Sequence, residues 1–372
     1  MSLRESRATV REVTLSAFPD GRMKAPVRRA SRLAALTIAA PAFVAACTTV
    51  APPPEPAPTQ SGPGYRYYLT GNPADVVRPT RGLWVAQGGG DDVDENYVRM
   101  GAYGGGGDFV VLRASGADDY NDYIYGLCHC DSVETIVLDQ GAGTSDPFVI
   151  GKIRNAEALF IGGGDQSNYI RYWKGTPVQD AINHVAAKPA PIGGTSAGMA
   201  VMGEFVYSAE GKESLTSAAA LADPYAPDLT LARDFLRLSG LENIITDQHL
   251  QERDRIGRTV ALLARLQADG WSTALRAIAA DRETAVHIDP ATGMAEVFAT
   301  PDHPTPYAYF MVPTGPPPAC APGKPLTTAA ISVYRLGPGG SFDLAKWLGT
   351  GGIGYELRVQ DGRLHSSREN NY

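Results

Sequence analysis

Cysteine is scarce in this chain, with four residues in 372, and histidine occurs only six times. Cys128-His129-Cys130 lacks the CxxC spacing typical of structural zinc sites, and no second ligand pair accompanies it. We therefore predict no metal and no cofactor. For Cys128 and Cys130 a loop disulfide is favoured over a metal site, with Cys320 as one candidate partner, and the sequence leaves the pairing open.

Long apolar runs and an excess of basic residues are also missing from most of the chain. Beyond residue 46, no stretch is long and apolar enough to span a membrane. The first 46 residues carry eight Lys or Arg and three Asp or Glu, so the remainder has a net charge of −12. An acidic body disfavours a nucleic-acid partner.

The N-terminus has the pattern of a secretory signal, residues 1–46, with Met23 as a candidate true start. A basic segment precedes an apolar run, and "VAAC" at its end resembles a bacterial lipobox. This resemblance implies lipidation of Cys47 and a periplasmic or cell-surface location, with a lipid anchor as the contact with the membrane. The Pro-rich segment 47–64 would then be a tether. The alternative is an uncleaved membrane helix, although its apolar run at 33–46 is short for a span.

Five apolar strands alternate with helical patterns from about residue 82. In the helical segment 176–188, Val178, Ala181, Ile182 and Val185 follow a spacing of three and four residues. Buried strands that alternate with amphipathic helices predict an α/β fold with a mostly parallel sheet covered on both faces. The strands are expected in "GLWVAQGG", "DFVVLRASG", "ETIVLD", "ALFIGGGDQ" and "APIGGTS".

After about residue 286 the sequence pattern predicts mainly strands. A hairpin with its turn at 289–293 is followed by further apolar strands joined by loops rich in proline and glycine. We expect an α/β catalytic domain at 65–300, and C-terminal strands at 301–372 that pack on it or extend it.

A candidate nucleophile lies in "IGGTSAGMAVMGE", where residues 194–198 fit G-x-S-x-G. A strand precedes Ser196 and a helical pattern follows it, as in a nucleophile elbow, where small neighbours permit a strained turn. The alternative is an ordinary glycine-rich turn. A serine needs a base, and His249 is the best candidate, because it follows an apolar run and precedes a helix at a predicted sheet edge. The arginines that follow it also fit a solvated helix face.

The stretches "FIGGGDQ", "IGGTSAGMAVMGE" and "DQHLQERDRIGR" resemble the signature stretches of cyanophycinases, which belong to the serine-peptidase family that includes dipeptidase E. The resemblance covers about residues 80–300. It implies a flavodoxin-like or amidotransferase-like α/β fold, a Ser-His-acid triad and cleavage of β-aspartyl bonds. By position it makes Ser196 the nucleophile, His249 the base and Gln166 a ligand of the aspartyl unit. Further polar residues around the pocket would be Asp247, Gln248, Arg253, Arg255 and Arg258.

In the mechanism that this resemblance implies, the amide of Ala197 and that of Gly163 or Gly164 would form the oxyanion hole. The acid of the triad is the point where the chain departs from the family. The family's stretch "DE-x-TA" reads "DRETA" here, with Arg282 at the expected glutamate. An arginine cannot accept the imidazole proton. We expect Glu283 to replace the acid, with Asp281 as the second candidate.

The function expected from these residues is that of a secreted, lipid-anchored serine hydrolase that cleaves β-aspartyl peptide bonds. The polymer cyanophycin and small isoaspartyl or aspartyl peptides remain open as substrates, and the family suggests a homodimer. The alternative is a non-catalytic peptide-binding lipoprotein with a degenerate triad. A thiol hydrolase is disfavoured because the elbow residue is serine. The acidic loop 88–95 would repel phosphate. A place near the substrate's amine or guanidinium end is left as a point to test, and the alternative is a turn that caps a helix.

Overall fold

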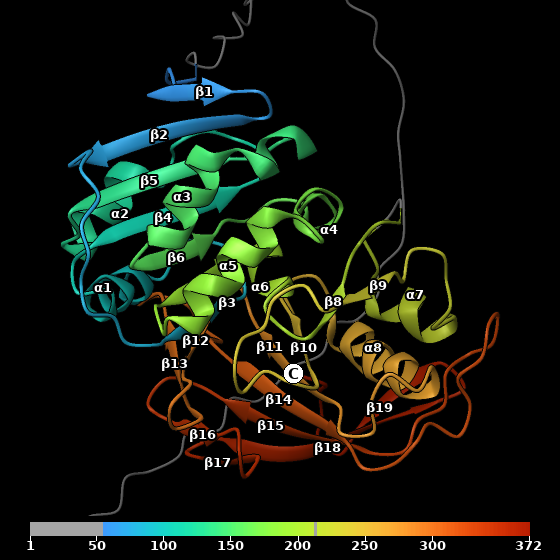
Figure 1. Ribbon diagram of the computed structural model, residues 1–372. Helices are drawn as coiled ribbons and strands as arrows, with labels where there is room; N and C mark the ends of the chain where they lie inside the picture. The colour runs from blue at the N-terminus through green and yellow to red at the C-terminus, as the bar shows by residue number, and fades with distance from the viewer. Residues whose placement is uncertain (1–54, 212–213) are drawn as a thin grey trace, which may run out of the picture. The chain divides into compact units, whose positions relative to one another are not determined.

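Two β-sheets organise the part of the chain that the computed structural model describes, residues 55–211 and 214–372 (Figure 1). In order across the first sheet, the strands are β1 (Gln60–Gly62), β2 (Tyr65–Gly71), β5 (Ser132–Val137), β4 (Asp108–Arg113), β6 (Ala158–Ile161), β7 (Ile192–Thr195), β3 (Trp84–Gln87), β12 (Thr284–Asp289), β13 (Met294–Ala299), β16 (Ser341–Asp343) and β17 (Leu348–Thr350). In the second they are β19 (Arg363–Ser366), β18 (Ile353–Gln360), β15 (Ile331–Leu336), β14 (Ala308–Pro313), β11 (Arg276–Ala280), β10 (Ile244–Asp247), β8 (Phe205–Tyr207) and β9 (Leu231–Arg233).

The expected mostly parallel sheet is only partly correct. The five predicted strands are present and form the parallel block β5-β4-β6-β7-β3. Outside this block the first sheet is antiparallel, and in the second sheet only β8, β10 and β11 run parallel. Short turns join the antiparallel pairs β12–β13, β16–β17 and β18–β19, and longer connections join the other antiparallel pairs of the C-terminal strands. They extend both sheets, so the chain beyond residue 300 is built into the same unit.

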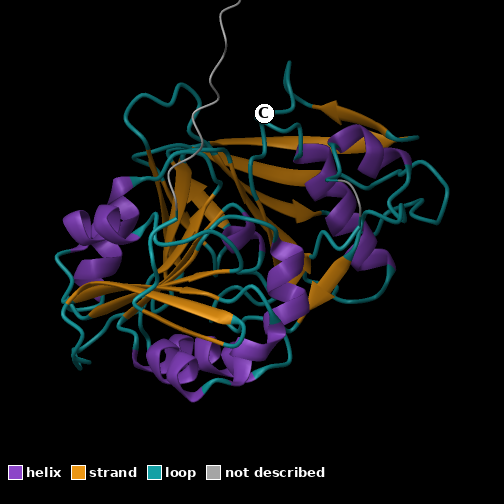
Figure 2. Ribbon diagram, turned by 90° about the horizontal axis from the view of Figure 1, so that it is seen from above, coloured by secondary structure: helices purple, strands orange, loops and turns teal. Residues whose placement is uncertain are grey.

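Helices cover both faces of the parallel block (Figure 2). Along β4, Phe109 and Val111 pack in one apolar cluster, while Val110 and Leu112 pack in another. Successive side chains of a strand point to opposite faces, so each apolar run supplies two cores. One core includes α1 (Asp94–Tyr103) and α2 (Asn121–Cys128). The other includes α3 (Pro147–Asn155), α4 (Gln166–Trp173), α5 (Pro177–Ala187) and the short α6 (Ala197–Ala200).

The second sheet packs between the core that includes α3 to α6 and a separate helical layer. Ile244 and Ile278 share a cluster with the first sheet, whereas their neighbours Ile245 and Ala277 lie in the cluster of α8 (Ile256–Ala268). The short helix α7 (Ser217–Ala222) covers the same side. The C-terminal ends of β3, β6 and β7 therefore meet those of β10 and β11 at one place, which is where ligands bind in α/β proteins.

The predicted signal segment, residues 1–46, and the predicted lipidation site Cys47 lie outside the described residues. The predicted tether reaches too far, because Gln60–Gly62 pair with Tyr65–Tyr67 as an antiparallel edge hairpin. Among the described residues, no helix combines the length and the apolar character needed to cross a membrane.

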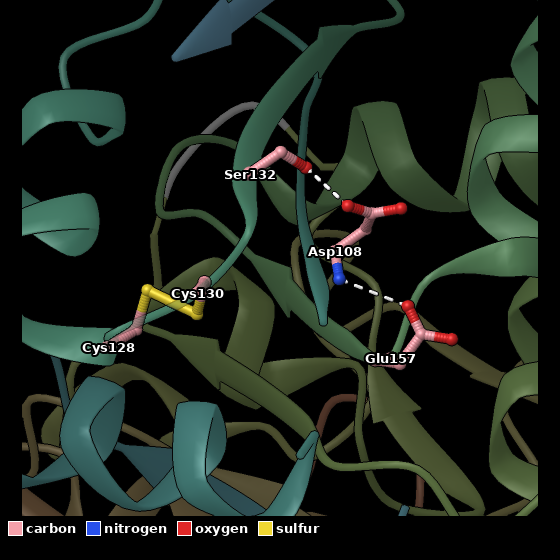
Figure 3. The surroundings of a disulfide bond; sticks show 5 residues. All are labelled: Asp108, Cys128, Cys130, Ser132 and Glu157. Atoms are coloured by element: carbon pink, nitrogen blue, oxygen red, sulfur yellow. Dashed lines mark hydrogen bonds between the residues drawn. A yellow bond between two sulfur atoms is a disulfide. The ribbon is translucent and has the colours of Figure 1, made fainter. Parts of the chain in front are cut away.

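The structure shows the predicted loop disulfide and settles its pairing, which the sequence left open. Cys128 and Cys130 form a disulfide (Figure 3). Cys320 is a free thiol. Helix α2 ends at Cys128, and His129 turns the chain with a left-handed φ of 52°. This turn brings the two Cα atoms to 5.2 Å, within the range that a disulfide bridges. The disulfide precedes β5 at the amino-terminal edge of the parallel block, opposite the glycine loops that follow the strands.

Candidate active site

Ser196 occupies a strained turn between β7 and α6. Its φ of 52° and ψ of −112° lie outside the regions that most residues adopt. Two glycines make the turn possible. A Cβ on Gly194 would lie 2.5 Å from the Gly198 carbonyl carbon, and one on Gly198 would lie 2.0 Å from the Ile161 oxygen. This geometry is that of a nucleophile elbow, which presents the hydroxyl at the carboxyl edge of the sheet.

The second sheet brings His249 to Ser196. Its Nε2 lies 3.0 Å from the Ser196 Oγ, although 53 positions separate the two residues in sequence. The His249 backbone N–H donates to the Gly88 carbonyl at 2.9 Å, and its φ is 49°. A Cβ on Gly89 would lie 2.2 Å from Nε2, so the loop after β3 must carry glycine there. The loop 88–90 thus supports the imidazole.

Glu252 is the carboxylate that contacts the other ring nitrogen. Its Oε2 lies 2.7 Å from His249 Nδ1, three residues along the same turn. The expectation of Glu283 is wrong, because that side chain forms an ion pair with Arg282 and contacts Thr300 at 3.3 Å. On the turn after β11, Glu283 also has a φ of 55°. Its carboxylate is therefore committed to its neighbours on that turn.

The second candidate, Asp281, supports the turn rather than the imidazole. Its Oδ1 accepts from the Gln251 N–H at 2.9 Å, and its Oδ2 accepts from the Tyr309 hydroxyl at 3.3 Å. Burial raises the pKa of Asp281 to about 7. Asp281 thereby ties β11 to the turn that carries His249 and Glu252.

The electrostatics keep the imidazole neutral and the carboxylate charged at neutral pH. Burial lowers the pKa of His249 below its ordinary value, and the positive charges of Arg253 and Arg255 act in the same direction, while Glu252 opposes them. Burial alone would raise the pKa of Glu252. The hydrogen bond from His249 and the charges of Arg253 and Arg282 outweigh it, so the pKa of Glu252 is lowered. A neutral imidazole can accept a proton from serine.

The glycine loop after β6 borders Ser196. A Cβ on Gly163 would lie 3.6 Å from the Ser196 Cβ. The Tyr169 hydroxyl lies 3.1 Å from the Gly163 carbonyl oxygen, and the Gly163 amide faces the Tyr120 hydroxyl. In a trans peptide, C=O and N–H point in opposite directions, so the Gly164 amide points away from Tyr169. Of the two glycines considered for an oxyanion hole, Gly164 has the freer amide.

A cavity of about 260 Å³ opens beside Ser196. Of the polar residues expected around a pocket, four line it: Gln166, Gln248, Arg253 and Arg255. Arg255 is buried and donates to the Gln248 side chain at 2.5 Å and to Ser214 Oγ at 2.9 Å. Among the described residues, it has no ion pair with a carboxylate. Burial, and then the nearby charge of Arg258, lowers the pKa of Arg255 to about 10.

Asp247 and Arg258 do not line this cavity. They form a buried ion pair with two contacts, and Asp247 also accepts from Thr259 Oγ1 at 2.7 Å. Arg258 is fully buried under β10 and stacks over the Tyr207 ring at 4.8 Å. Asp247 accepts from the Gln248 N–H at 2.9 Å as well, so the pair holds the chain just before His249. Its contribution is to the position of the histidine.

Sequence reasoning missed Glu252. The available signal was its spacing of three residues from His249 in "HLQE", which is meaningful only if the chain turns tightly there. The turn does so, because the Arg253 N–H donates to the His249 carbonyl at 3.1 Å.

Residues 123–225 match the family model of peptidase family S51, a segment that includes the elbow serine. The chain is also 24% identical over 195 residues to the cyanophycinase of Synechococcus elongatus, across 50% of this chain and 57% of that protein. The cyanophycinase of Trichormus variabilis is 26% identical over 135 residues, across 36% of this chain and 42% of that protein. Residues 123–225 are thus similar to the peptidases of family S51.

The S51 relationship agrees with the resemblance seen in the three sequence stretches. The matches span about half the length of the cyanophycinases. The substrate of this chain therefore has to be inferred from the residues of its own site. The crystal structure of a peptidase from an acI-B1 Actinobacterium aligns with 71% of this chain and over 98% of the peptidase chain, with 14% sequence identity and a TM-score of 0.46.

Proposed function

We propose that this chain is a serine hydrolase that cleaves β-aspartyl peptide bonds. The observation that carries the proposal is the 3.0 Å contact between Ser196 Oγ and His249 Nε2 at a strained elbow. A hydroxyl is a weak nucleophile until a base takes its proton, and the neutral imidazole is in hydrogen-bond reach. The family relationship supports peptide bonds as the target.

The residues around Ser196 fit the steps of acyl transfer. Ser196 Oγ attacks the carbonyl carbon while His249 takes its proton, and the amides of Ala197 and Gly164 stabilise the oxyanion. His249 then protonates the leaving amine, and water attacks the acyl-enzyme to release the acid. A single oxyanion donor lowers the barrier by about 3 kcal/mol in such sites.

The buried charge of Arg255 supports a substrate with a carboxylate next to the scissile bond. Within residues 55–211 and 214–372, no carboxylate pairs with Arg255. A buried cation without an anionic partner is costly, and a bound carboxylate would offset that cost. In a β-aspartyl peptide, the free α-carboxylate lies close to the β-carbonyl that the serine attacks. The guanidinium fork can hold such a group through two parallel hydrogen bonds.

The contact between Glu252 and His249 favours the enzyme over the non-catalytic peptide-binding protein. A degenerate triad would lack a carboxylate at Nδ1, and here one lies at 2.7 Å. Secretion and the lipid anchor at Cys47 rest on the sequence pattern alone and remain part of the proposal.

A panel of dipeptides tests the linkage. We expect β-Asp-Arg and other β-Asp-Xaa peptides to be hydrolysed at least about 100-fold faster than their α-Asp isomers. Both linkages place a carboxylate two carbons from the scissile carbonyl, within reach of Arg255, but only the β-linkage places the ammonium group beside that carboxylate rather than beside the scissile carbonyl. Release of free aspartate, followed by chromatography, measures both series, and cyanophycin granules form a third arm. Equal rates on the two linkages would contradict the proposal.

Arg255→Gln tests the carboxylate contact. We expect KM for a β-Asp dipeptide to rise by about 10- to 100-fold, the size of a lost charged hydrogen bond of about 1.5–3 kcal/mol. Steady-state kinetics should show little change for a substrate whose α-carboxylate is a primary amide. Arg358→Gln is the matched control, because the Arg358 side chain is 65% exposed and does not line this cavity. A similar rise in that variant would argue against a specific role for Arg255.

A further inference from the structure

The histidine of the proposed hydrolase has its acid on its own turn. Glu252 follows His249 by three residues and contacts Nδ1, while Arg282 occupies the position that the cyanophycinase resemblance assigns to the acid. We infer that Glu252 is the positioning residue that fixes the tautomer of His249, and that the site of the acid has moved from the turn after β11 to the turn after β10. This inference rests on the proposed function and adds a residue to it.

The need for an acid at Nδ1 follows from the contact at Nε2. For Nε2 to accept the Ser196 proton, the neutral imidazole must carry its own proton on Nδ1. A carboxylate at Nδ1 accepts that proton's hydrogen bond and later stabilises the imidazolium. The 2.7 Å distance between Nδ1 and Glu252 Oε2 suits a charge-assisted hydrogen bond.

The other nearby carboxylates have different partners. Glu283 pairs with Arg282 and Thr300, and Asp281 holds the Gln251 N–H. Asp247 is taken by the buried guanidinium of Arg258. Within residues 55–211 and 214–372, Glu252 is the carboxylate hydrogen-bonded to His249.

Backbone hydrogen bonds hold the turn that carries His249 and Glu252, so the carboxylate can stay at a fixed distance from the imidazole. The Leu250 N–H donates to Ala280 O, and the Gln251 N–H donates to the carboxylate of Asp281. With the His249 N–H on the Gly88 carbonyl, three hydrogen bonds tie the turn to β11 and to the loop after β3. Because the backbone of this turn is already fixed, placing the Glu252 carboxylate at Nδ1 costs only the conformational entropy of the side chain.

The contact with His249 also keeps Glu252 charged. Burial would raise the pKa of Glu252, but the hydrogen bond from His249 lowers it, and the charges of Arg253 and Arg282 act in the same direction. The Glu252 side chain is 36% exposed, and the imidazole that it contacts is 5% exposed.

The test compares Glu252→Gln with Glu252→Asp and the matched control Glu283→Gln. We expect Glu252→Gln to lower kcat on a β-Asp dipeptide by about 100-fold or more, with KM within about 3-fold, as for loss of a triad acid. Glu252→Asp keeps the charge and should recover part of kcat. Glu283→Gln should stay within about 3-fold of wild type.

The pH profile separates positioning from a merely structural effect. Glu252 raises the pKa of His249, against the lowering by burial, Arg253 and Arg255. Removing the Glu252 charge should therefore shift the acid limb of kcat/KM to lower pH, since the imidazole must be neutral to act as base. Glu283→Gln should leave that limb unchanged.

Long-range ¹H–¹⁵N spectra of ¹⁵N-histidine protein give a readout that needs no turnover. Wild type should show His249 neutral with its proton on Nδ1, and Glu252→Gln should lower its pKa. An unaltered tautomer and pKa in Glu252→Gln, or a larger loss of kcat in Glu283→Gln, would overturn the inference. Failure of wild type to cleave any peptide would reject the proposed function, while the spectra would still decide the role of Glu252.

Discussion

Ser196→Ala is expected to lower kcat on β-aspartyl dipeptides by about 10⁴-fold or more while the protein stays folded. The loss follows because no covalent acyl-enzyme can form, and the oxyanion donors and the cavity supply only the residual rate. Alanine keeps the Cβ, so the strain at a φ of 52° is unchanged and only the hydroxyl contact with His249 is lost. Aspartate release and a fluorophosphonate probe, which labels only an activated serine, measure the effect.

The control for this variant is Ser332→Ala, an exposed position on β15 remote from the elbow. It should match wild type in both assays. Thermal unfolding of Ser196→Ala should fall close to that of wild type, which separates chemistry from folding. Hydrolysis at the parent rate by Ser196→Ala would remove the nucleophile, and with it the proposed mechanism.

The parallel block of the first sheet was predictable because its five strands carry their own signal. Each of the five parallel strands is an apolar run that ends in a glycine-rich loop, and Val178, Ala181, Ile182 and Val185 are all buried on α5. The second sheet was not predictable in the same way. The sequence shows that β10 and β11 are apolar, but pairing between strands is set by packing of the whole chain, which no local pattern encodes.

In the candidate site, too, local sequence signals identify some residues, while others depend on how the whole chain packs. Ser196 and His249 sit in stretches whose glycines and flanking elements identify them, and the structure brings their side chains together. We predicted Glu283 because it is adjacent in sequence to Arg282, which occupies the position that the cyanophycinase resemblance assigns to the acid. The turn after β11 directs that side chain to Arg282 instead, and the contact of Glu252 depends on a backbone turn with a left-handed residue at its start.

The residues taken for ligands show why residue type alone cannot assign a role. Arg255 and Arg258 are three positions apart at the start of α8, where both lie on the same side of the helix. Arg255 lines the cavity, whereas Arg258 is fully buried against Asp247. Whether an arginine faces a ligand or a buried carboxylate is decided by what packs on the helix.

The buried pair between Asp247 and Arg258 gives the largest expected effect on stability. Arg258→Met should lower the free energy of unfolding by about 3–5 kcal/mol, because it leaves the Asp247 carboxylate buried without its cation. Urea denaturation measures the change. The residual carboxylate can still accept from Thr259 and the Gln248 N–H, which places the expected value toward the lower end of that range.

The matched control is Lys346→Met, which removes an ion pair with Asp343 whose lysine side chain is 74% exposed. It should change the free energy of unfolding by less than about 1 kcal/mol. The double variant Asp247→Asn with Arg258→Met should be less destabilised than Arg258→Met alone, because no unpaired charge remains. If Arg258→Met changed the free energy of unfolding as little as the surface control does, the ion pair would not be what holds the end of β10 before His249. The position of the imidazole would then have to depend on the loop at Gly88–Gly90 and on Asp281.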